Sequence, residues 1–403
     1  MKLPDAPWHQ RPSLKKLVDT LDGTGGMIRF VGGAVRDSLL GVPVKDIDLA
    51  TVLKPDDVMA RLKKAGFKVV PTGIDHGTVT AVTKDGPVEI TTLRRDVSTD
   101  GRRATVAYSD DWREDAARRD FTINALSADP VTLEIYDYFD GLKDLEARHI
   151  RFIGSAQQRI AEDHLRIMRY FRFLARFSED QVDDAAYTAC THAAASLDSL
   201  SRERIADELM KLLATDDPVF AVSKMLDAGI FGYILTETDS RASAQLDQLV
   251  RREQAHDIKP LAIRRLVALL PKDADKAVGI VTGLKFSKKI RRATADRLTS
   301  LEPTASGIPA LAYHHGQEAA QDIALLFAAD DELKTSLSKL AIWEKPVFPI
   351  TGGDLIAMGL EAGPIVTRTL AKVEHAWIQE GFPDGERAAH LAKEAVFQLN
   401  VMK

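Results

Sequence analysis

The sequence has 403 residues, of which 45% are hydrophobic and 28% are charged, and its formal net charge is −5. This length predicts about two to four domains, and the composition is that of a globular protein able to bury cores. The net charge excludes a generally basic surface, although a local basic cluster can still bind a polyanion. The single cysteine, Cys190, excludes an intramolecular disulfide bond and fits a reducing cytoplasm.

No segment predicts export or membrane insertion. The N-terminal residues MKLPDAPWHQRPSLKKLV lack the apolar core of a signal peptide. The apolar run IALLFAA in the C-terminal half is far too short to cross a bilayer. We therefore expect a cytoplasmic protein with no membrane partner, and nothing in the sequence implies a protein partner.

Residues 28–140 predict a mixed α/β region. The predicted elements are a strand at 28–31, a helix at 36–41, a strand at 46–51, a helix at 54–66 and a hairpin at 76–93. Pro55 at the start and Gly66 at the end mark the second helix, and Asp85-Gly86 marks the hairpin turn. After residue 145 the sequence predicts only helices. We expect an α/β head followed by an all-α remainder, divided into an extension (1–27), a head (28–150), a neck (151–215), a body (216–300) and a tail (301–403).

Two acidic residues stand one residue apart in the segment DIDLAT. In a strand, residues i and i+2 point to the same face, so Asp46 and Asp48 project together while Ile47 and Leu49 face the other way. Two carboxylates this close repel each other, and a divalent cation such as Mg²⁺ relieves the repulsion. The pair predicts a metal site for phosphoryl transfer. The alternative is a solvated strand edge that resists aggregation.

The preceding segment, RFVGGAVRD, combines flexible backbone with a cation. Gly32 and Gly33 lie between a predicted strand and helix, where backbone N–H groups can approach an anion without interference from Cβ. Arg36 follows within one turn and can add a forked cation to a triphosphate. Taken singly, such glycines usually form a turn and such an arginine lies on the surface. Together with the two acids they indicate a site for a metal-bound nucleoside triphosphate.

Four motifs resemble, in order, those of the tRNA nucleotidyltransferase/poly(A) polymerase family, within the DNA polymerase beta-like nucleotidyltransferase superfamily. They are GGAVRDSLLGVPVKDIDLAT (32–51), RRDFTINALS (118–127), YDYFDGLKDL (136–145) and EDHLRIMRYFRF (162–173). The C-terminal GGDLIAMGLEAGP is similar more loosely. The resemblance covers roughly the first half of the chain. It implies a polymerase beta-like head with a mixed sheet, then a helical neck that recognises the base, a body and a tRNA-binding tail.

The resemblance also implies roles for residues of the head. Asp46 and Asp48 would hold two Mg²⁺ ions that activate a tRNA 3′-hydroxyl and steady the leaving pyrophosphate. Glu89, in the strand VEITTL, is a further candidate ligand, and the alternative is a solvent-facing strand residue.

The motif RRDFTINAL carries three further candidates. Asp120 would accept a hydrogen bond from the ribose 2′-hydroxyl, and Arg119 would contact the nucleotide or its phosphates. Asn124, predicted one helical turn after Asp120, shares its face and groups with the nucleotide-binding residues. The alternative is an ordinary helix with an internal hydrogen bond and surface arginines.

The segment AEDHLRIMRYFRFLARF (161–177) predicts an amphipathic helix. Arg166, Arg169, Arg172 and Arg176 fall within an arc of about 120°, beside Asp163. They form either a plain basic face or, as the resemblance implies, a template in which Asp163 and Arg166 imitate a complementary base. Cytosine and adenine both present an amino donor beside a ring-nitrogen acceptor, so this pair would admit CTP and ATP and reject uracil and guanine. Arg169 and Arg172 would steady the template or the nucleotide.

A basic stretch lies in the segment LKFSKKIRR (284–292). Its members are Lys285, Lys288, Lys289, Arg291 and Arg292. They are either a solvated face or contacts to the phosphates of the tRNA acceptor arm. The glycines of GGDLIAMGLEAGP likewise either offer amides to an RNA phosphate or cap helices.

The resemblance predicts template-independent addition of C, C and A to the tRNA 3′ end, with release of pyrophosphate. A poly(A) polymerase shares the motifs, but residues 66–82 resemble the CCA-adding branch. A partial enzyme that adds only CC typically has a short flexible loop in the head, whereas residues 94–117 form a long segment here. A metal-dependent HD phosphohydrolase is disfavoured because His256-Asp257 lacks partner ligands. An inactive tRNA-binding protein would not need the intact acids.

Overall fold

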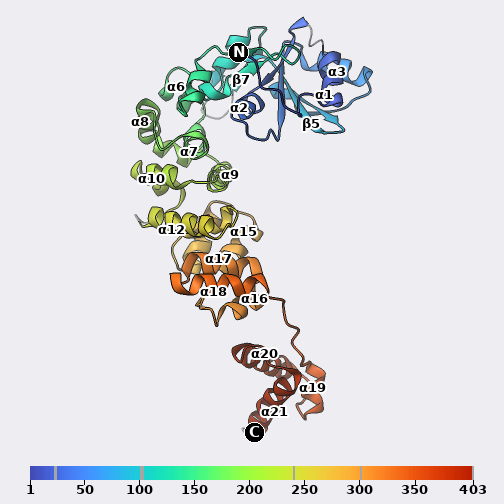
Figure 1. Cartoon of the computed structure of the whole chain (residues 1–403), viewed down its shortest axis with the longest axis vertical. Helices are drawn as coiled ribbons and strands as arrows, with labels where there is room; N and C mark the ends of the chain where they lie inside the picture. The colour runs from blue at the N-terminus through green and yellow to red at the C-terminus, as the bar shows by residue number, and fades with distance from the viewer. Residues whose placement is uncertain (22–24, 100–103, 239–240, 300–301, 402–403) are drawn as a thin grey trace. The chain divides into compact units, whose positions relative to one another are not determined.

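The chain folds into two compact units. The computed structural model describes residues 1–21, 25–99, 104–238, 241–299 and 302–401. One unit spans Met1–Glu237 and the other Thr238–Lys403. Among the described residues every strand lies in the first unit and the second is helical, so the predicted α/β head with an all-α remainder is confirmed (Figure 1). The finer division into extension, head, neck, body and tail stays a prediction.

A seven-stranded mixed sheet, in the order β3-β4-β5-β2-β1-β8-β9, forms the centre of the head. Its strands are β1 (Ile28–Val31), β2 (Ile47–Thr51), β3 (Lys68–Gly73), β4 (Thr78–Thr83), β5 (Gly86–Thr92), β8 (Ser127–Ala128) and β9 (Ile135–Tyr136). β2 and β5 are parallel, and the other neighbours are antiparallel. Two further strands, β6 (Arg94–Thr99) and β7 (Ala104–Tyr108), pair separately. The predicted strands and the hairpin are therefore present.

Short helices accompany the sheet. They are α1 (Pro12–Thr20), α2 (Gly33–Leu39), α3 (Pro55–Lys64), α4 (Trp112–Ala117), α5 (Gly141–Glu146) and the 3₁₀ turns η2 (Ile74–His76) and η3 (Thr122–Asn124). α3 matches its prediction, with proline and two acids in its first turn. α2 begins three residues earlier than predicted, because Gly32 has a φ of 65° and turns the chain directly from β1 into the helix.

Helices α6 to α11 complete the first unit. They are α6 (Ala156–Glu162), α7 (Arg166–Phe177), α8 (Asp184–His192), the 3₁₀ turn η4 (Ala194–Ser199), α9 (Arg202–Leu213), α10 (Val219–Asp227) and α11 (Phe231–Ile234). The prediction of one continuous helix over 161–177 is wrong. Asp163 has an extended backbone (φ −150°, ψ 107°), and its Oδ1 accepts a hydrogen bond from the Leu165 amide at 3.1 Å, which starts a new helix.

Aromatic side chains fix α7 against the head. Phe121 lies 4.8 Å from Phe152 and 4.9 Å from Phe173, ring centroid to centroid, and Phe152 stacks on Tyr170 at 5.8 Å. All four rings are buried. Because the head and α7 share this core, the polar residues on the neighbouring face of α7 are held at a defined distance from the sheet.

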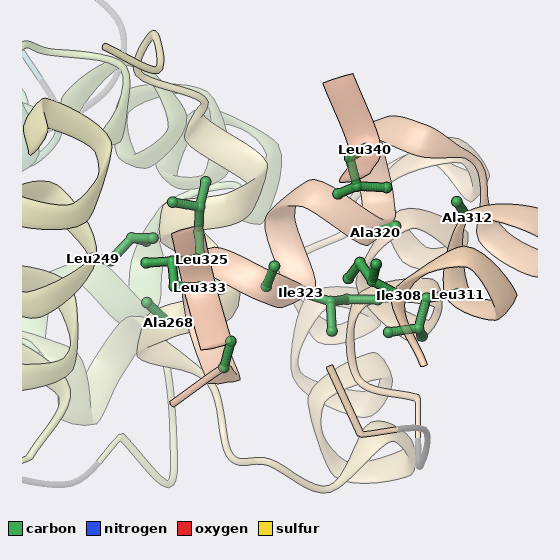
Figure 2. Close-up of a cluster of buried hydrophobic side chains, with 12 residues drawn as sticks. Leu249, Ala268, Ile308, Leu311, Ala312, Ala320, Ile323, Leu325, Leu333 and Leu340 are labelled. Carbon is green, nitrogen blue, oxygen red and sulfur yellow. The ribbon is translucent and has the colours of Figure 1, made fainter. Parts of the chain in front are cut away.

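The second unit contains helices only, among its described residues. They are α12 (Ala242–Ala255), α13 (Ala262–Leu269), α14 (Ala274–Gly283), α15 (Lys288–Arg297), α16 (Ile308–His315), α17 (Gln317–Phe327), α18 (Asp330–Ala341), α19 (Gly352–Ala357), α20 (Pro364–Gln379) and α21 (Gly385–Val401). Figure 2 shows one apolar core, in which Leu249, Ile308 and Leu325 are buried. A second core surrounds Leu355 and Trp377. None of the described helices is both long and apolar enough for a membrane span.

Candidate active site

Most of the predicted site residues line one cavity of about 420 Å³ in the first unit. The sheet, α2, the segment before η3, and α7 contribute to it. The predicted residues on its wall are Gly32, Gly33, Arg36, Asp48, Arg119, Asp120, Asn124, Asp163, Arg166 and Arg169. Three of the four sequence motifs, at 32–51, 118–127 and 162–173, therefore meet at one place.

A second cavity, of about 760 Å³, shares Gly33, Arg36 and Asp48 with the first. Asp46 and Arg172 line this second cavity. The acidic pair therefore stands where the two cavities meet, with Asp48 on the wall of both. A molecule in either cavity can reach the same carboxylate.

The strand geometry of the acidic pair matches its prediction in part. β2 begins at Ile47, so Asp46 lies directly before the strand and is exposed, whereas Asp48 lies within it and is half-buried. Ile47 and Leu49 are buried, as expected for the opposite face. Burial and the negative charges of Glu89 and Asp46 together raise the pKa of Asp48 to about 6, although Arg119 acts against them. The surroundings of Asp48 therefore disfavour the ionised form of its carboxyl group.

Glu89 lies beside Asp48. The two residues are register partners in the parallel strands β2 and β5, so their side chains share a face, and Glu89 is exposed. Among the described residues no group of three or more acidic, histidine or cysteine side chains is already arranged as a metal site. Mg²⁺ nevertheless needs only one or two carboxylates when water and phosphate oxygens complete its shell. Asp46 and Asp48 fit that requirement, because a divalent cation would relieve the repulsion that raises the pKa of Asp48.

The glycine turn needs its glycines to different degrees. Gly32 has a positive φ, and a Cβ at this residue would lie 3.1 Å from Nη1 of Arg119. Any side chain would be strained there and would push the arginine. A Cβ on Gly33 would make only ordinary contact, 3.6 Å from Nη2 of Arg36. Gly32 therefore sets the approach of Arg119 to the cavity wall.

Arg36 is buried, so its interpretation as an ordinary surface residue is excluded. Its Nε donates to Oδ1 of Asp37 at 2.8 Å, and its Nη1 donates to Oδ1 of Asn124. The guanidinium also lies 4.4 Å from the ring centroid of Phe177. Burial lowers the pKa of Arg36, and the carboxylate of Asp37 limits the shift. The cation is held in place before any ligand binds.

Asp120 joins the cavity wall to α7. It and Asn124 are not one α-helical turn apart, because the segment forms only the 3₁₀ turn η3, but Asn124 Nδ2 donates to Asp120 Oδ1 at 2.9 Å. Nε of Arg169 donates to Oδ2 of Asp120 at 2.7 Å. Burial acts against the ionised form, but Arg169 and the hydrogen bonds outweigh it and lower the pKa of Asp120. Asp120 is therefore an ionised carboxylate already engaged within the protein.

Asp163 and Arg166 lie in the same cavity with partners of their own. Nη2 of Arg204, on α9, donates to both oxygens of Asp163, at 3.0 and 3.2 Å. Nη1 of Arg166 donates to Oε2 of Glu162 at 2.7 Å, and Nη2 donates to the carbonyl of Arg118 at 3.0 Å. A carboxylate has about four acceptor positions and a guanidinium has five N–H groups, so both residues retain capacity for a ligand.

Arg169 and Arg172 are both tied to Glu208 on α9. Nε of Arg172 donates to Oε2 of Glu208 at 2.5 Å, and Nη1 of Arg169 lies 3.9 Å from Oε1. Burial opposes the charge of Arg169, but Asp120 and Glu208 together raise its pKa. The two arginines are thus held in place by carboxylates, one on each cavity.

The basic stretch predicted at 285–292 lies in the second unit, at the turn between α14 and α15 and in the first turn of α15. Lys285, Lys288, Lys289 and Arg292 are exposed and Arg291 is half-buried. Nε of Arg292 lies 3.7 Å from Asp296. The role of the basic stretch stays a prediction: it is either a solvated face or a contact to phosphate.

Sequence reasoning missed Arg118 and Arg204, which also line the first cavity, and Glu208, which contacts one arginine of each cavity. Arg204 and Glu208 are four residues apart on α9, so a helical pattern shows that they share a face. No pattern within one segment shows that this face meets α7. Arg118 stands next to Arg119 in the motif RRDFT, and this position is the signal that could have found it.

The two cavities together combine the carboxylates of Asp46 and Asp48 with several arginines that protein contacts hold in place. Such a wall fits a polyanion that carries a divalent cation, because the acids bind the metal and the arginines bind phosphate oxygens. It does not fit an apolar ligand. Asp163 and Arg166, an acceptor beside a donor, add a position for hydrogen bonding to a flat polar group.

Two family models match the chain. Residues 28–151 match the poly A polymerase head domain, and residues 181–241 match a model described as a probable RNA and SrmB-binding site of polymerase A. The first match contains the sheet, the glycine turn and the acidic pair. The second contains α9 with Arg204 and Glu208.

Relatives with similar sequences extend over nearly the whole chain. The CCA-adding enzyme of Lactococcus lactis is 33% identical, and the match covers 97% of this chain and 98% of the relative. The mitochondrial CCA tRNA nucleotidyltransferase 1 of Mus musculus is 32% identical over 92% of this chain and 87% of its own length. Among solved structures, the Bacillus stearothermophilus CCA-adding enzyme in complex with CTP is 27% identical, with a TM-score of 0.76 over 97% of this chain and all of that one.

Proposed function

The chain belongs to the family of CCA-adding enzymes and poly(A) polymerases, and we infer that it is a CCA tRNA nucleotidyltransferase. It adds C, C and A to the 3′ end of tRNA from CTP and ATP, without a nucleic-acid template. Full-length similarity to CCA-adding enzymes supports this function. The observation within the fold that carries it is the convergence of Asp48, the glycine turn and Asp163 with Arg166 on one cavity, with Asp46 on the adjoining one.

We propose that Asp46 and Asp48 are the catalytic carboxylates and hold two Mg²⁺ ions, with Glu89 as a further ligand. Bound Mg²⁺ would lower the pKa of the tRNA 3′-hydroxyl and neutralise charge on the departing pyrophosphate. The chain's own residues would position the reactants: the glycine turn leaves room for Arg119 at the cavity wall, and Asp48 lines both cavities. Positioning and electrostatic stabilisation account for most of catalysis in phosphoryl transfer.

The sugar and phosphates of the nucleotide occupy the first cavity in this proposal. Gly32, Gly33, Arg36 and Arg119 lie on the side where a triphosphate would bind beside the acids. Asp120 and Asn124 would face the ribose. Because the carboxylate of Asp120 is already engaged, a 2′-hydroxyl must share or replace one of its existing hydrogen bonds.

The base is selected by Asp163 and Arg166. The carboxylate accepts from the exocyclic amino group of cytosine or adenine, and the guanidinium donates to the adjacent ring nitrogen. Uracil and guanine would place acceptor against acceptor and donor against donor, at a cost of about 1–3 kcal/mol for each unpaired buried group. Arg204 and Glu162 hold the two side chains ready, and this preorganisation supports the proposal.

The tRNA 3′ end would enter through the second cavity. Its wall carries the acids Asp46 and Asp48 and the cations Arg172 and Arg176. Nη2 of Arg176 is 3.1 Å from Oδ2 of Asp37, so this cation too is fixed. The exposed basic stretch at 285–292 and the tail are proposed to contact the acceptor arm. A cytoplasmic location remains part of the same proposal.

One experiment separates this function from its alternatives. Purified protein, Mg²⁺ and a tRNA truncated before CCA are incubated with labelled CTP and ATP, singly and together. We expect two C residues from CTP alone and one following A when both are present. Long A tails would indicate a poly(A) polymerase. Incorporation of A only into tRNA that already ends in CC, or of CC without A, would indicate a partial enzyme.

A further inference from the structure

Asp115, on α4, is buried in the head and has no role in the reaction described above. Its carboxylate connects three segments. Oδ1 accepts from Nε of Arg118 at 2.8 Å and from the backbone N–H of Arg94 at 3.4 Å, and Oδ2 accepts from Nη2 of Arg119 at 3.4 Å. One buried acid therefore contacts two cavity arginines and the first residue of β6.

The cavity side of this connection is close to the nucleotide site. Arg118 and Arg119 both line the first cavity. Nη1 of Arg119 donates to the carbonyl of Asn124 at 3.4 Å, and the carbonyl of Arg118 accepts from Arg166 at 3.0 Å. The charge of Arg119 also limits the rise in the pKa of Asp48 that burial causes. A shift of either arginine would thus reach other groups of the cavity wall.

The other side of the connection is the β6–β7 pair (94–99 and 104–108). Arg94 begins β6, and its Nη1 donates to the carbonyl of His76. The neighbouring acid on α4, Glu114, accepts from Oγ of Ser109 at 2.6 Å, directly after β7. α4 therefore holds both ends of this strand pair where it leaves the head.

α4 itself is anchored and can transmit a displacement. The ring of Trp112, at its first residue, lies 4.1 Å from the guanidinium carbon of Arg29 on β1, and Trp112 packs against a small core with Leu93. Asp111 caps the helix by accepting from the amide of Arg113 at 2.7 Å. A short helix pinned at one end and carrying Asp115 near the other links the strand pair to the arginines mechanically.

We propose that Asp115 is a positioning residue that couples the β6–β7 pair to Arg118 and Arg119, so that nucleotide binding and the position of this pair depend on each other. The inference rests on the proposed function, because it takes the first cavity as the nucleotide site. Asp115 does not touch the nucleotide. It acts by holding the two guanidinium groups in one orientation relative to the strand pair.

The test compares Asp115→Asn with the matched control Glu114→Gln. Both changes remove one negative charge from the same helix and keep the size of the side chain. Glu114 contacts Ser109 and Arg95, whereas Asp115 also contacts the cavity arginines. Asp115→Glu keeps the negative charge on a longer side chain and tests whether the charge alone is enough for CTP binding and the exchange response.

Two readouts are needed, because a merely structural acid would alter stability alone. The first is the dissociation constant for CTP, by calorimetry with Mg²⁺, on protein that thermal unfolding shows to be folded. The second is amide hydrogen exchange of residues 94–99 and 104–108 with and without CTP. We expect CTP to change the exchange of the wild-type pair. In Asp115→Asn we expect about tenfold weaker CTP binding, equivalent to about 1.4 kcal/mol, and loss of the exchange response, with both retained in Glu114→Gln.

Several outcomes would overturn the coupling. They are no exchange response to CTP in the wild type, a response that persists in Asp115→Asn, or equal effects of Asp115→Asn and Glu114→Gln. Incorporation of C, C and A by the wild type is measured in parallel. If the wild type adds CCA while these results fail, only the role of Asp115 is wrong; if it adds no nucleotide to tRNA, the proposed function itself is wrong.

Discussion

Arginine–carboxylate networks occur in both units, and they differ in what surrounds them. In the first unit, Arg169 and Asp120 form a pair that lines a cavity of about 420 Å³, so ligand atoms can reach the charges. In the second unit, Glu253 accepts from Arg264 at 2.6 Å and from Arg265 at 2.7 Å, and all three side chains are almost completely buried.

The same chemical pairing therefore serves two purposes. A pair on a cavity wall keeps a cation or an acceptor oriented for a ligand, at some cost to stability. A fully buried pair contributes little net stability, but removing one partner leaves a charge without compensation. Changes in the first network should alter binding and catalysis, and changes in the second should alter folding.

The largest effect is expected for the acidic pair. Asp46→Ala should lower nucleotide addition by at least about 10³-fold, because this residue is proposed to hold metal and makes no contribution to the apolar core. Steady-state addition of CTP to truncated tRNA measures the loss. Thermal unfolding should be unchanged, since Asp46 is exposed. A fall in stability that matches the loss of activity would show that the residue is structural.

For the buried network of the second unit we expect a loss of stability and not a direct effect on catalysis. Asp322 is buried and accepts from Nε of Arg264 at 2.5 Å and from Nε of Arg297 at 2.7 Å. Asp322→Ala should cost about 3–5 kcal/mol of unfolding free energy, because it leaves two buried cations short of a partner. Urea unfolding measures the change. Glu318→Gln is the control, since this exposed partner of Arg297 should contribute less than about 1 kcal/mol.

Arg166→Ala should change base choice more than tRNA affinity. Removal of the donor removes about 1–3 kcal/mol of discrimination, which corresponds to roughly 5- to 150-fold between CTP and UTP. The ratio of kcat/KM values for the two nucleotides, on one tRNA, gives the result. If the ratio is preserved and only tRNA binding weakens, Arg166 does not read the base.

Metal affinity should depend on pH through Asp48. Its raised pKa of about 6 means that the carboxyl is protonated below pH 6, and a proton competes with Mg²⁺. The apparent affinity should fall about tenfold for each pH unit below 6 and be constant well above it. Calorimetric titration of Mg²⁺ from pH 5 to 8 measures the pH below which the affinity begins to fall. Glu89→Gln removes a charge that raises the pKa of Asp48, so the fall in Mg²⁺ affinity should begin at a lower pH.

The smallest effect is expected on the exposed face of α15. Replacing Lys288 and Lys289 together by alanine should weaken tRNA binding only a few-fold and make the affinity less dependent on salt, since each phosphate contact adds to counterion release. Filter binding at several salt concentrations gives the slope. An unchanged slope would assign the basic stretch to a solvated face. CTP binding should be the same as in the wild type.

Short-range patterns in the sequence determined much of the head. The period-two alternation predicted that Asp48 and Leu49 point to opposite sides, and it holds because side chains alternate in any strand. Pro55 and Gly66 bounded α3 correctly, since proline and glycine act on the local backbone. The motifs also contain most of the residues that line the first cavity, although not Arg204.

Only the tertiary structure decided how those residues are held. The break at Asp163, the burial of Arg36 and the hydrogen bonds of Asp115 join residues from segments that no local pattern relates. Arg204 meets Asp163 across 41 positions in the chain because α9 packs against α7. Backbone preferences act over a few residues, and a periodic pattern gives the face of a helix but not its neighbour. Charge pairing across a core therefore depends on packing, and packing is settled by the whole fold.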